Sequence, residues 1–362
     1  MVKFGIIGLG AMGSEHVNNF KKGRIVGGEL VAVCDTDETL KEKYSDYKFY
    51  TDYKELIDSG EVDCVLIATP HYSHTYIGAY ALEKNIHTIV EKPISVHKKD
   101  CEILISAHKD PKTVFSAMFC VREQPFNQKI KELIPTLGNI RRINYIITDW
   151  FRSQAYYNSG TWRATWEGEG GGILANQLPH NMDLLQWWFG QPKAIYANCN
   201  FGKYHNIEVE DDVEAIFYYE NGATCMLTAN TCEYPGTNRL EVVGDMGKLV
   251  MENGEITVWY NKESTINFSD TTPNTWDTPS IKEKVTFELT PIEDILMLHA
   301  KIVNNTIEAI EKGTPVTAPA EEGMKSVEMA NAMILSSIKG EKINLPIDGD
   351  EYAKVLEGLK EK

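Results

Sequence analysis

Lys92 is the residue of this chain best placed to do chemistry. It lies in Glu91-Lys92-Pro93, directly after the apolar run from Ile86 to Val90, which predicts a buried strand. A lysine at the carboxyl end of such a strand, facing a cofactor, can take up and release a proton if burial lowers its pKa. We expect Lys92 to be a general base or acid. The ordinary alternative is a surface lysine that starts a loop.

A glycine-rich turn near the start predicts where a cofactor binds. Residues 4–7 read as a strand, Gly8-Leu9-Gly10-Ala11-Met12-Gly13 as a turn, and residues 14–22 as a helix. The three glycines allow a tight turn, a close approach of pyrophosphate and close helix packing, while N–H groups at the helix start face the phosphates. We therefore expect cofactor contacts from Gly8, Gly10, Ala11, Met12 and Gly13.

Asp35 indicates which dinucleotide is bound. It ends a second predicted strand, 30–34, and lies 35 − 13 = 22 residues after Gly13, near the spacing of dinucleotide-binding domains. A carboxylate there accepts hydrogen bonds from the ribose hydroxyls and repels a 2′-phosphate. NAD is therefore favoured over NADP.

Composition excludes several classes of protein. The chain has 362 residues, 43% hydrophobic and 24% charged, which fits two ordinary globular domains. A net charge of −16 argues against nucleic-acid binding, and no apolar run approaches the length of a membrane span. Strand residues begin at Val2, so we expect no targeting segment, and seven scattered cysteines favour a cytoplasmic location.

Strands and helices alternate in residues 1–122, which predicts an NAD(P)-binding Rossmann domain with a doubly wound parallel sheet. Ligands gather at the carboxyl ends of such strands, so the glycine turn, Asp35, Thr69-Pro70-His71 with His74, and Glu91-Lys92 should share one rim.

Residues 123–362 predict an α+β domain for substrate binding and oligomerisation, with a large open antiparallel sheet. The expected strands cover 139–151, 193–201, 209–219, 223–231, 238–243 and 247–251, and the helices 126–134, 179–189, 291–312 and 320–339. Asn221-Gly222 should form a hairpin turn. An open sheet face needs covering, so we expect a homodimer or homotetramer through it.

A second informative block runs from Gly170-Gly171-Gly172 through Asn176-Gln177 to His180 and Asp183. Together with the glycine turn, Glu91-Lys92-Pro93 and the ending from Glu322-Gly323 to Pro346, this block resembles the Gfo/Idh/MocA oxidoreductases over nearly the whole chain. The resemblance implies a Rossmann domain followed by a domain with an open sheet, activity on sugars or cyclitols, and His180 beside a catalytic Lys92. It also implies that the Lys92–Pro93 peptide is cis.

One position departs from the family pattern. Many members carry an aspartate four residues before the histidine, where this chain has Asn176. Residues 176 and 180 can point into the same space, but an amide orients a hydroxyl without accepting its proton. The resemblance extends to an Asn-Gln variant that acts on larger glycosyl substrates.

Several other residues are candidates with ordinary alternatives. Aromatic faces suit sugar rings, so Tyr156 and Trp162 with Arg163 are predicted to bind substrate, and by resemblance Trp162 and Arg163 also approach the cofactor; core packing is the alternative. Asp183 is expected to support His180 or the substrate. No metal site is expected, although His71, His74 and His180 could form one. The acids at 208–212 read as a solvated strand start.

These observations predict an NAD-dependent dehydrogenase that transfers hydride between a secondary hydroxyl of a sugar, glycoside or cyclitol and nicotinamide. His180 and Asn176 would position the hydroxyl whose proton Lys92 removes. Two alternatives remain: a glycosidase that uses tightly bound NAD for transient oxidation and elimination, and a non-catalytic sugar-sensing regulator.

Overall fold

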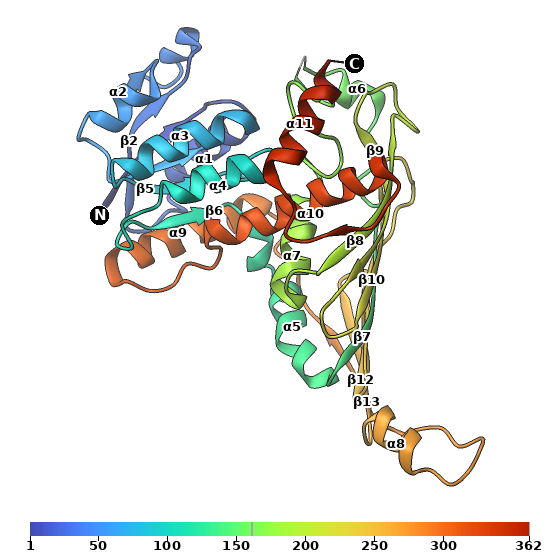
Figure 1. Cartoon of the computed structure of the whole chain (residues 1–362). Coiled ribbons are helices and arrows are strands. Elements are labelled where there is room, and N and C mark those ends of the chain that lie inside the picture. Colours follow the sequence, from blue (N-terminus) through green and yellow to red (C-terminus); the bar gives the residue numbers. More distant parts are fainter. Residues whose placement is uncertain (161, 362) are drawn as a thin grey trace.

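A computed structural model describes residues 1–160 and 162–361 and arranges them in two layered domains, each with its own hydrophobic core (Figure 1). Of the helices within these ranges, none has the length and hydropathy that a membrane span requires.

The first domain is built on a six-stranded parallel sheet of order β3-β2-β1-β4-β5-β6. Its strands are β1 (Val2–Ile7), β2 (Gly28–Cys34), β3 (Lys48–Tyr50), β4 (Cys64–Ile67), β5 (His87–Val90) and β6 (Phe115–Ala117). Its helical segments are α1 (Ala11–Lys21), η1 (Glu38–Lys41), α2 (Tyr53–Asp58), α3 (His71–Glu83), α4 (Lys98–Ser106) and η2 (Cys120–Glu123). The strand order reverses beside β1, where such sheets bind their ligands. The predicted doubly wound sheet is confirmed.

The second domain is built on a nine-stranded sheet of order β14-β13-β12-β11-β7-β10-β9-β8-β15. Its strands are β7 (Ile140–Ile147), β8 (Ala194–Phe201), β9 (Glu210–Tyr218), β10 (Thr224–Asn230), β11 (Asn238–Gly244), β12 (Gly247–Glu252), β13 (Glu255–Asn261), β14 (Ile281–Glu288) and β15 (Ile343–Asn344). The remaining helical segments are α5 (Pro125–Leu133), η3 (Ile134–Leu137), α6 (Gln154–Tyr157), α7 (Pro179–Phe189), α8 (Thr265–Thr271), α9 (Ile295–Lys312), α10 (Ala320–Lys339) and α11 (Gly349–Lys360).

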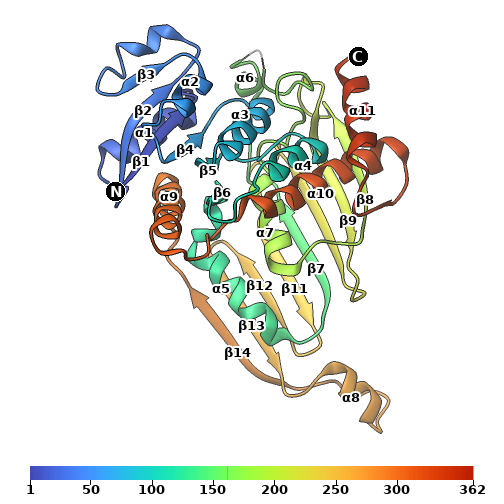
Figure 2. The same cartoon turned by 60° about the vertical axis from the view of Figure 1, so that its left-hand side comes forward.

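The large sheet is mostly antiparallel, as predicted, with one exception. Strands β7 and β10 pair in parallel, because the β9–β10 hairpin docks beside β7 as a unit. That hairpin turns at Asn221-Gly222, where Gly222 has φ +85°, so the predicted turn is confirmed. The segment containing β13, β14 and α8 was not predicted, and Figure 2 shows it extending to the far end of the sheet. Strand β14 is an edge strand and largely exposed, although Val285 and Phe287 alternate with polar residues in its sequence.

Helices α5, α7 and α10 cover one face of the large sheet, and none of the described helices covers the other (Figure 1). Three apolar residues form a row across adjacent strands on that bare face. Tyr196 of β8 is opposite Ile216 of β9, which is opposite Met226 of β10. Tyr196 is 44% exposed and Met226 is 54% exposed. The predicted open face therefore exists.

The two domains are joined by helices from the end of the chain. Helix α9 packs against α1, and residues 298–327 contribute to the core of the first domain. Helix α10 packs on β8 and α7 of the second domain and on α4 of the first. The division at residue 122 stays a prediction, since the chain returns to the first domain after forming the second sheet.

Candidate active site

The glycine turn has the shape that a dinucleotide pyrophosphate requires. A Cβ on residue 13 would lie 1.8 Å from the Gly8 carbonyl oxygen, so only glycine fits there. At Gly10 a Cβ would meet no atom within 4 Å, and α1 begins there without a side-chain cap. The first-turn N–H groups, including those of Ala11 and Met12, have no intrahelical partners. This turn therefore fits an anion.

Asp35 lies at the same edge of the sheet, directly after β2. Its Oδ2 accepts a hydrogen bond from the Leu9 N–H at 2.7 Å, and its Oδ1 accepts one from the Asp37 N–H at 3.0 Å. The carboxylate is thus held against the glycine turn, where a ribose attached to the pyrophosphate would lie.

Lys92 follows β5 and reaches across to the second domain. Its Nζ donates a hydrogen bond of 2.9 Å to the backbone oxygen of Asn176, and its backbone N–H donates one of 3.1 Å to Glu91. The Lys92–Pro93 peptide is cis, as the resemblance implied. Burial lowers the pKa of Lys92, although Glu91 opposes this effect. The structure therefore brings the amine to the glycine-rich block, 84 residues away in sequence.

His180 is the second residue of α7 and lies in the same site. Its ring meets the Phe119 ring edge-on, with centroids 6.2 Å apart, and its Nδ1 is buried without a hydrogen-bond partner among the described residues. Burial first, then the charges of Lys92 and His299, lower the pKa of His180 to about 3. The imidazole is therefore neutral near pH 7 and can accept or donate one hydrogen bond.

Glu169 is a site residue that the sequence argument missed. Its side chain is buried, and its two oxygens accept hydrogen bonds from the Asn176 side-chain amide and from the Ala164 N–H, the latter at 2.7 Å. Burial raises the pKa of Glu169. A glutamate flanked by glycines in the sequence suggests a solvated loop. Only its hydrogen bond with Asn176, which the sequence does not reveal, identifies Glu169 as a site residue.

The predicted aromatic and arginine residues form a connected layer beside Lys92. Trp162 meets the His71 ring edge-on at 5.9 Å, and the Arg163 guanidinium lies 4.7 Å from the Trp162 ring centroid and 4.8 Å from that of Tyr156. Arg163 also donates a hydrogen bond of 2.9 Å to the Tyr156 hydroxyl. Gln177 donates to the same hydroxyl at 3.4 Å, which joins the layer to the glycine-rich block.

Two histidines of the Thr69–His74 segment contact backbone carbonyl groups of neighbouring loops. The two ring nitrogens of His74 contact the Pro93 and Thr69 carbonyl oxygens, both at 2.8 Å. The Nδ1 of His71 lies 3.3 Å from the Glu169 carbonyl oxygen, and burial lowers the pKa of His71 to about 3. Both histidines therefore connect the rim of the first domain to the reacting loops. Thr69 and the exposed Pro70 lie at the start of α3.

A second buried polar group lies under the Lys92 loop. Glu91 accepts from His16 at 2.8 Å, and its carboxylate is 4.0 Å from the Nε2 of His299. These contacts, opposed by burial, lower the pKa of Glu91 to about 2. The sulfur of Cys120 lies 3.7 Å from His299 and also belongs to this group.

The acids at 208–212 do not form a solvated strand start; that prediction was wrong for three of them. Glu210, Asp211 and Asp212 are buried. Glu210 accepts the backbone N–H groups of Gly172 and Leu174 at 2.8 and 3.0 Å, and burial raises its pKa to about 7. It thereby holds the turn that leads to residue 176.

Asp183 is fully buried at the junction of the domains. Both of its oxygens accept from Arg122, at 2.7 and 2.6 Å, and its Oδ1 also accepts from Gln186 at 3.0 Å. Arg122 further contacts Glu322 at 2.7 Å and the Thr317 carbonyl oxygen at 3.0 Å. The structure brings Asp183 near the site through its helix but places its carboxylate in an ion pair.

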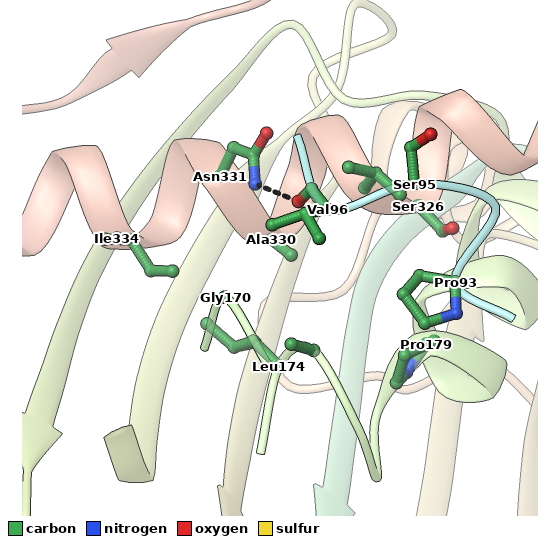
Figure 3. Close-up of a pocket in the computed structure, with 12 residues that line it drawn as sticks. Pro93, Ser95, Val96, Gly170, Leu174, Pro179, Ser326, Ala330, Asn331 and Ile334 are labelled. Atoms are coloured by element: carbon green, nitrogen blue, oxygen red, sulfur yellow. Dashed lines mark hydrogen bonds between the residues drawn. The ribbon is translucent and has the colours of Figure 1, made fainter. Parts of the chain in front are cut away.

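Figure 3 shows a small, largely apolar pocket lined by Pro93 and Pro179, the chain neighbours of Lys92 and His180. It is lined by the loop after Lys92, by the glycine-rich block and by α10, and contains neither Lys92 nor His180. Asn331 of α10 donates to the Val96 carbonyl oxygen at 3.5 Å and accepts from the Lys98 N–H at 3.0 Å. Helix α10 thus packs against both loops that carry the reacting groups.

The arrangement suits proton transfer combined with a bound dinucleotide. An amine of lowered pKa, a neutral imidazole and a fixed amide meet at the edge where the glycine turn lies. In residues 1–160 and 162–361, no group of three His, Cys, Asp or Glu side chains could hold a metal ion.

Comparison with known proteins identifies two matching family models. One, described as the NAD-binding Rossmann fold of an oxidoreductase family, matches residues 2–119, and the C-terminal alpha/beta domain of the same family matches residues 131–345. The first domain is therefore an NAD-binding Rossmann domain.

Curated relatives include an inositol 2-dehydrogenase of Salmonella paratyphi B, 28% identical over 192 residues, which are 51% of this chain and 54% of the relative. A myo-inositol 2-dehydrogenase of Thermotoga maritima is 25% identical over 70% of this chain and 75% of its own. The chain thus spans about half the length of the first of these relatives. Among solved structures, the WlbA dehydrogenase of Bordetella pertussis, in complex with NADH and UDP-GlcNAcA, has the same fold, with a TM-score of 0.77 and 23% identity over 96% of this chain and 99% of that one.

Proposed function

Because the chain belongs to the Gfo/Idh/MocA oxidoreductase family, we propose that it is an NAD-dependent dehydrogenase that oxidises a secondary hydroxyl of a sugar, glycoside or cyclitol. The observation that supports this proposal is the contact of the Lys92 Nζ, just after β5, with the backbone oxygen of Asn176, four residues before His180. The names of the inositol dehydrogenase relatives support the substrate class.

In the proposed reaction, neutral Lys92 accepts the proton of the reacting hydroxyl as the carbon loses its hydride. Bound nicotinamide supplies the hydride acceptor. His180, neutral at working pH, and the Asn176 amide orient the hydroxyl, while Trp162, Arg163 and Tyr156 shape the pocket and exclude water. In the reverse direction the Lys92 ammonium returns the proton and stabilises developing charge on oxygen.

The test is the appearance of reduced-nicotinamide absorbance with NAD or NADP across inositols, free hexoses, nucleotide sugars and glycosides. Net NADH formation with at least one of these classes is the expected result. Release of an aglycone without net reduction would indicate the glycosidase reaction instead, and no turnover across the whole panel would indicate a sugar-sensing regulator.

We expect Asp35→Asn to weaken NADH binding by at least about tenfold, because hydrogen bonds to a charged group contribute about 1.5–3 kcal/mol. We also expect the variant to show a smaller preference for NADH over NADPH. The amide keeps an acceptor for the Leu9 N–H but loses the charge that repels a 2′-phosphate. Fluorescence titration with NADH and NADPH measures both effects. Asp46→Asn, at an exposed ion pair with Lys21, is the control. An unchanged ratio of the two affinities would contradict the role of Asp35.

We also propose that the bare face of the large sheet joins copies of this chain. Two exposed apolar side chains, Tyr196 and Met226, with the half-buried Ile216 between them, support self-association. Sedimentation velocity at micromolar concentration should show a dimer or tetramer that Met226→Glu dissociates. Ile103→Glu, at a similarly exposed position on α4, should not. A wild-type monomer would rule the interface out.

A cytoplasmic location stays part of the proposal. All seven cysteines are free thiols in the structure, which agrees with a reducing compartment.

A further inference from the structure

We propose that Glu169 is the carboxylate of the proton-transfer site and that it acts by holding the Asn176 amide and by placing a negative charge near Lys92. It is a positioning residue, since it acts through Asn176 and Lys92. The inference rests on the proposed dehydrogenase function and deepens it. It also accounts for the asparagine that stands where many family members have aspartate.

The geometry of Glu169 leaves it few other roles. The residue is 3% exposed, and each carboxylate oxygen has a partner inside the protein: the Asn176 Nδ2 for one and the Ala164 N–H for the other. Its own carbonyl oxygen contacts His71. The carboxylate is thus held between the segment that carries Arg163 and the start of the block that leads to His180.

This contact fixes the orientation of Asn176. A carboxylate only accepts hydrogen bonds, so the amide nitrogen must face Glu169 and the amide oxygen must face away from it. Within the described residues no donor contacts that Oδ1, and Asn176 is only half-buried. The backbone oxygen of the same residue accepts a hydrogen bond of 2.9 Å from the Lys92 amine. A substrate hydroxyl can therefore donate to Oδ1, and this contact holds the substrate for proton transfer to Lys92.

The charge of Glu169 has a separate consequence for Lys92. When the hydroxyl O–H bond breaks and the Nζ–H bond forms, Lys92 becomes an ammonium in a buried site, while the carbon loses its hydride to nicotinamide. A nearby negative charge stabilises that ammonium. The pKa of Lys92, lowered mainly by burial, is raised by Glu91, Cys120 and Glu169 and lowered by Arg163.

The other ionisable groups that bear on this pair come from every neighbouring element. They are His71 and His74 of α3, His180 of α7, His299 of α9, and Glu210 of β9. Glu91 accepts from His16 and from the backbone N–H of Lys92. Glu169 is the carboxylate that contacts Asn176.

The first experiment needs no substrate. The pH dependence of Lys92 acylation by acetic anhydride, followed by mass spectrometry of the NADH-binding protein, reports the ionisation of the amine. E169Q should move the midpoint to lower pH, because it removes the negative charge, and E169D should leave it close to wild type. The control is E208Q, since Glu208 holds the same segment through the Trp166 N–H at 2.6 Å. An unchanged midpoint in E169Q, or an equal shift in E208Q, would overturn the proposal.

The second experiment exchanges the two side chains. With the best polyol of the panel, E169Q should lose about 10- to 100-fold in turnover, because a neutral amide holds the Asn176 side chain less strongly than a carboxylate does. N176D should also lose turnover, because two carboxylates then meet. The double variant N176D/E169Q restores one carboxylate and one amide in contact and should recover most of the loss.

Each outcome decides between the possibilities. If the double variant turns over no faster than the two single variants, the proposed role of Glu169 is overturned. It is also overturned if neither E169Q nor the double variant binds NADH, since Glu169 would then be needed only for folding. If E169Q fails to bind NADH and the double variant binds it, the proposed role of Glu169 is supported. If wild type oxidises no compound of the panel, the dehydrogenase proposal fails while the acylation experiment still tests the link between Glu169 and Lys92.

Discussion

Lys92→Ala is expected to lower turnover by at least about a hundredfold while NADH still binds, because a positioned general base contributes about 10²- to 10⁴-fold. The loss should be specific to the proton transfer. The glycine turn and Asp35, which form the cofactor crevice, lie on other strands and keep their contacts. Steady-state kinetics with the best substrate of the panel, together with NADH titration, measures both quantities.

The pH profile of the wild type provides an independent check on Lys92. Its pKa lies below the ordinary 10.5 because of burial. Oxidation requires the neutral amine, so turnover should rise with pH through this lowered pKa and fall as pH drops below it. The reverse reaction requires the Lys92 ammonium, so its turnover should fall as the pH rises through the same pKa.

The matched control is Lys99→Ala, at an exposed lysine that pairs with Asp350 on the surface. It should keep wild-type turnover. Added methylamine should restore part of the activity of Lys92→Ala, since a free amine can occupy the vacated space. Near-normal turnover of Lys92→Ala would refute the assignment of the base.

Arg122→Met should lower the free energy of unfolding by about 3–5 kcal/mol, the usual cost of removing one partner from a buried ion pair. The side chain is 1% exposed, and Asp183, its bidentate partner, is fully buried. Without the guanidinium, the carboxylate must stay buried as an unpaired charge or take up a proton. Urea denaturation followed by far-UV circular dichroism measures the change.

Two variants separate this charge effect from simple loss of packing. The double variant Arg122→Met/Asp183→Leu removes both charges and should recover much of the stability. Arg24→Met, at a more exposed pair with Asp294, should cost at most about 1 kcal/mol. Equal losses in Arg122→Met and Arg24→Met would contradict the importance of the buried pair.

Helix boundaries that follow apolar periodicity were well predicted. The predicted helices 179–189 and 320–339 agree with α7 and α10. Each has an apolar face and ends at a glycine, Gly190 for α7 and Gly340 for α10. Strands β13 and β14 were missed. The parallel pairing of β7 with β10 was also missed, since it depends on where a hairpin docks and has no local signature.

Predictions for charged residues depended on burial, which their sequence neighbours do not reveal. Glu210 and Asp211 stand in an acidic run that is typical of solvent, yet both are buried because backbone N–H groups are aimed at them. Asp183 pairs with Arg122, 61 residues away in sequence, and Glu169 accepts a hydrogen bond from Asn176, 7 residues further along.

The sequence alone determined the groups that can react and the crevice they serve. Glycine spacing, a strand ending in Asp35 and the Glu91-Lys92-Pro93 tripeptide reflect local backbone requirements, which short stretches express directly. Tertiary structure decided which of these groups meet. The hold of Glu169 on the Asn176 amide forms within the glycine-rich segment. The contact of Lys92 with Asn176 and the Arg122–Asp183 pair join distant segments. Such contacts depend on how two domains pack, and packing is a property of the whole chain.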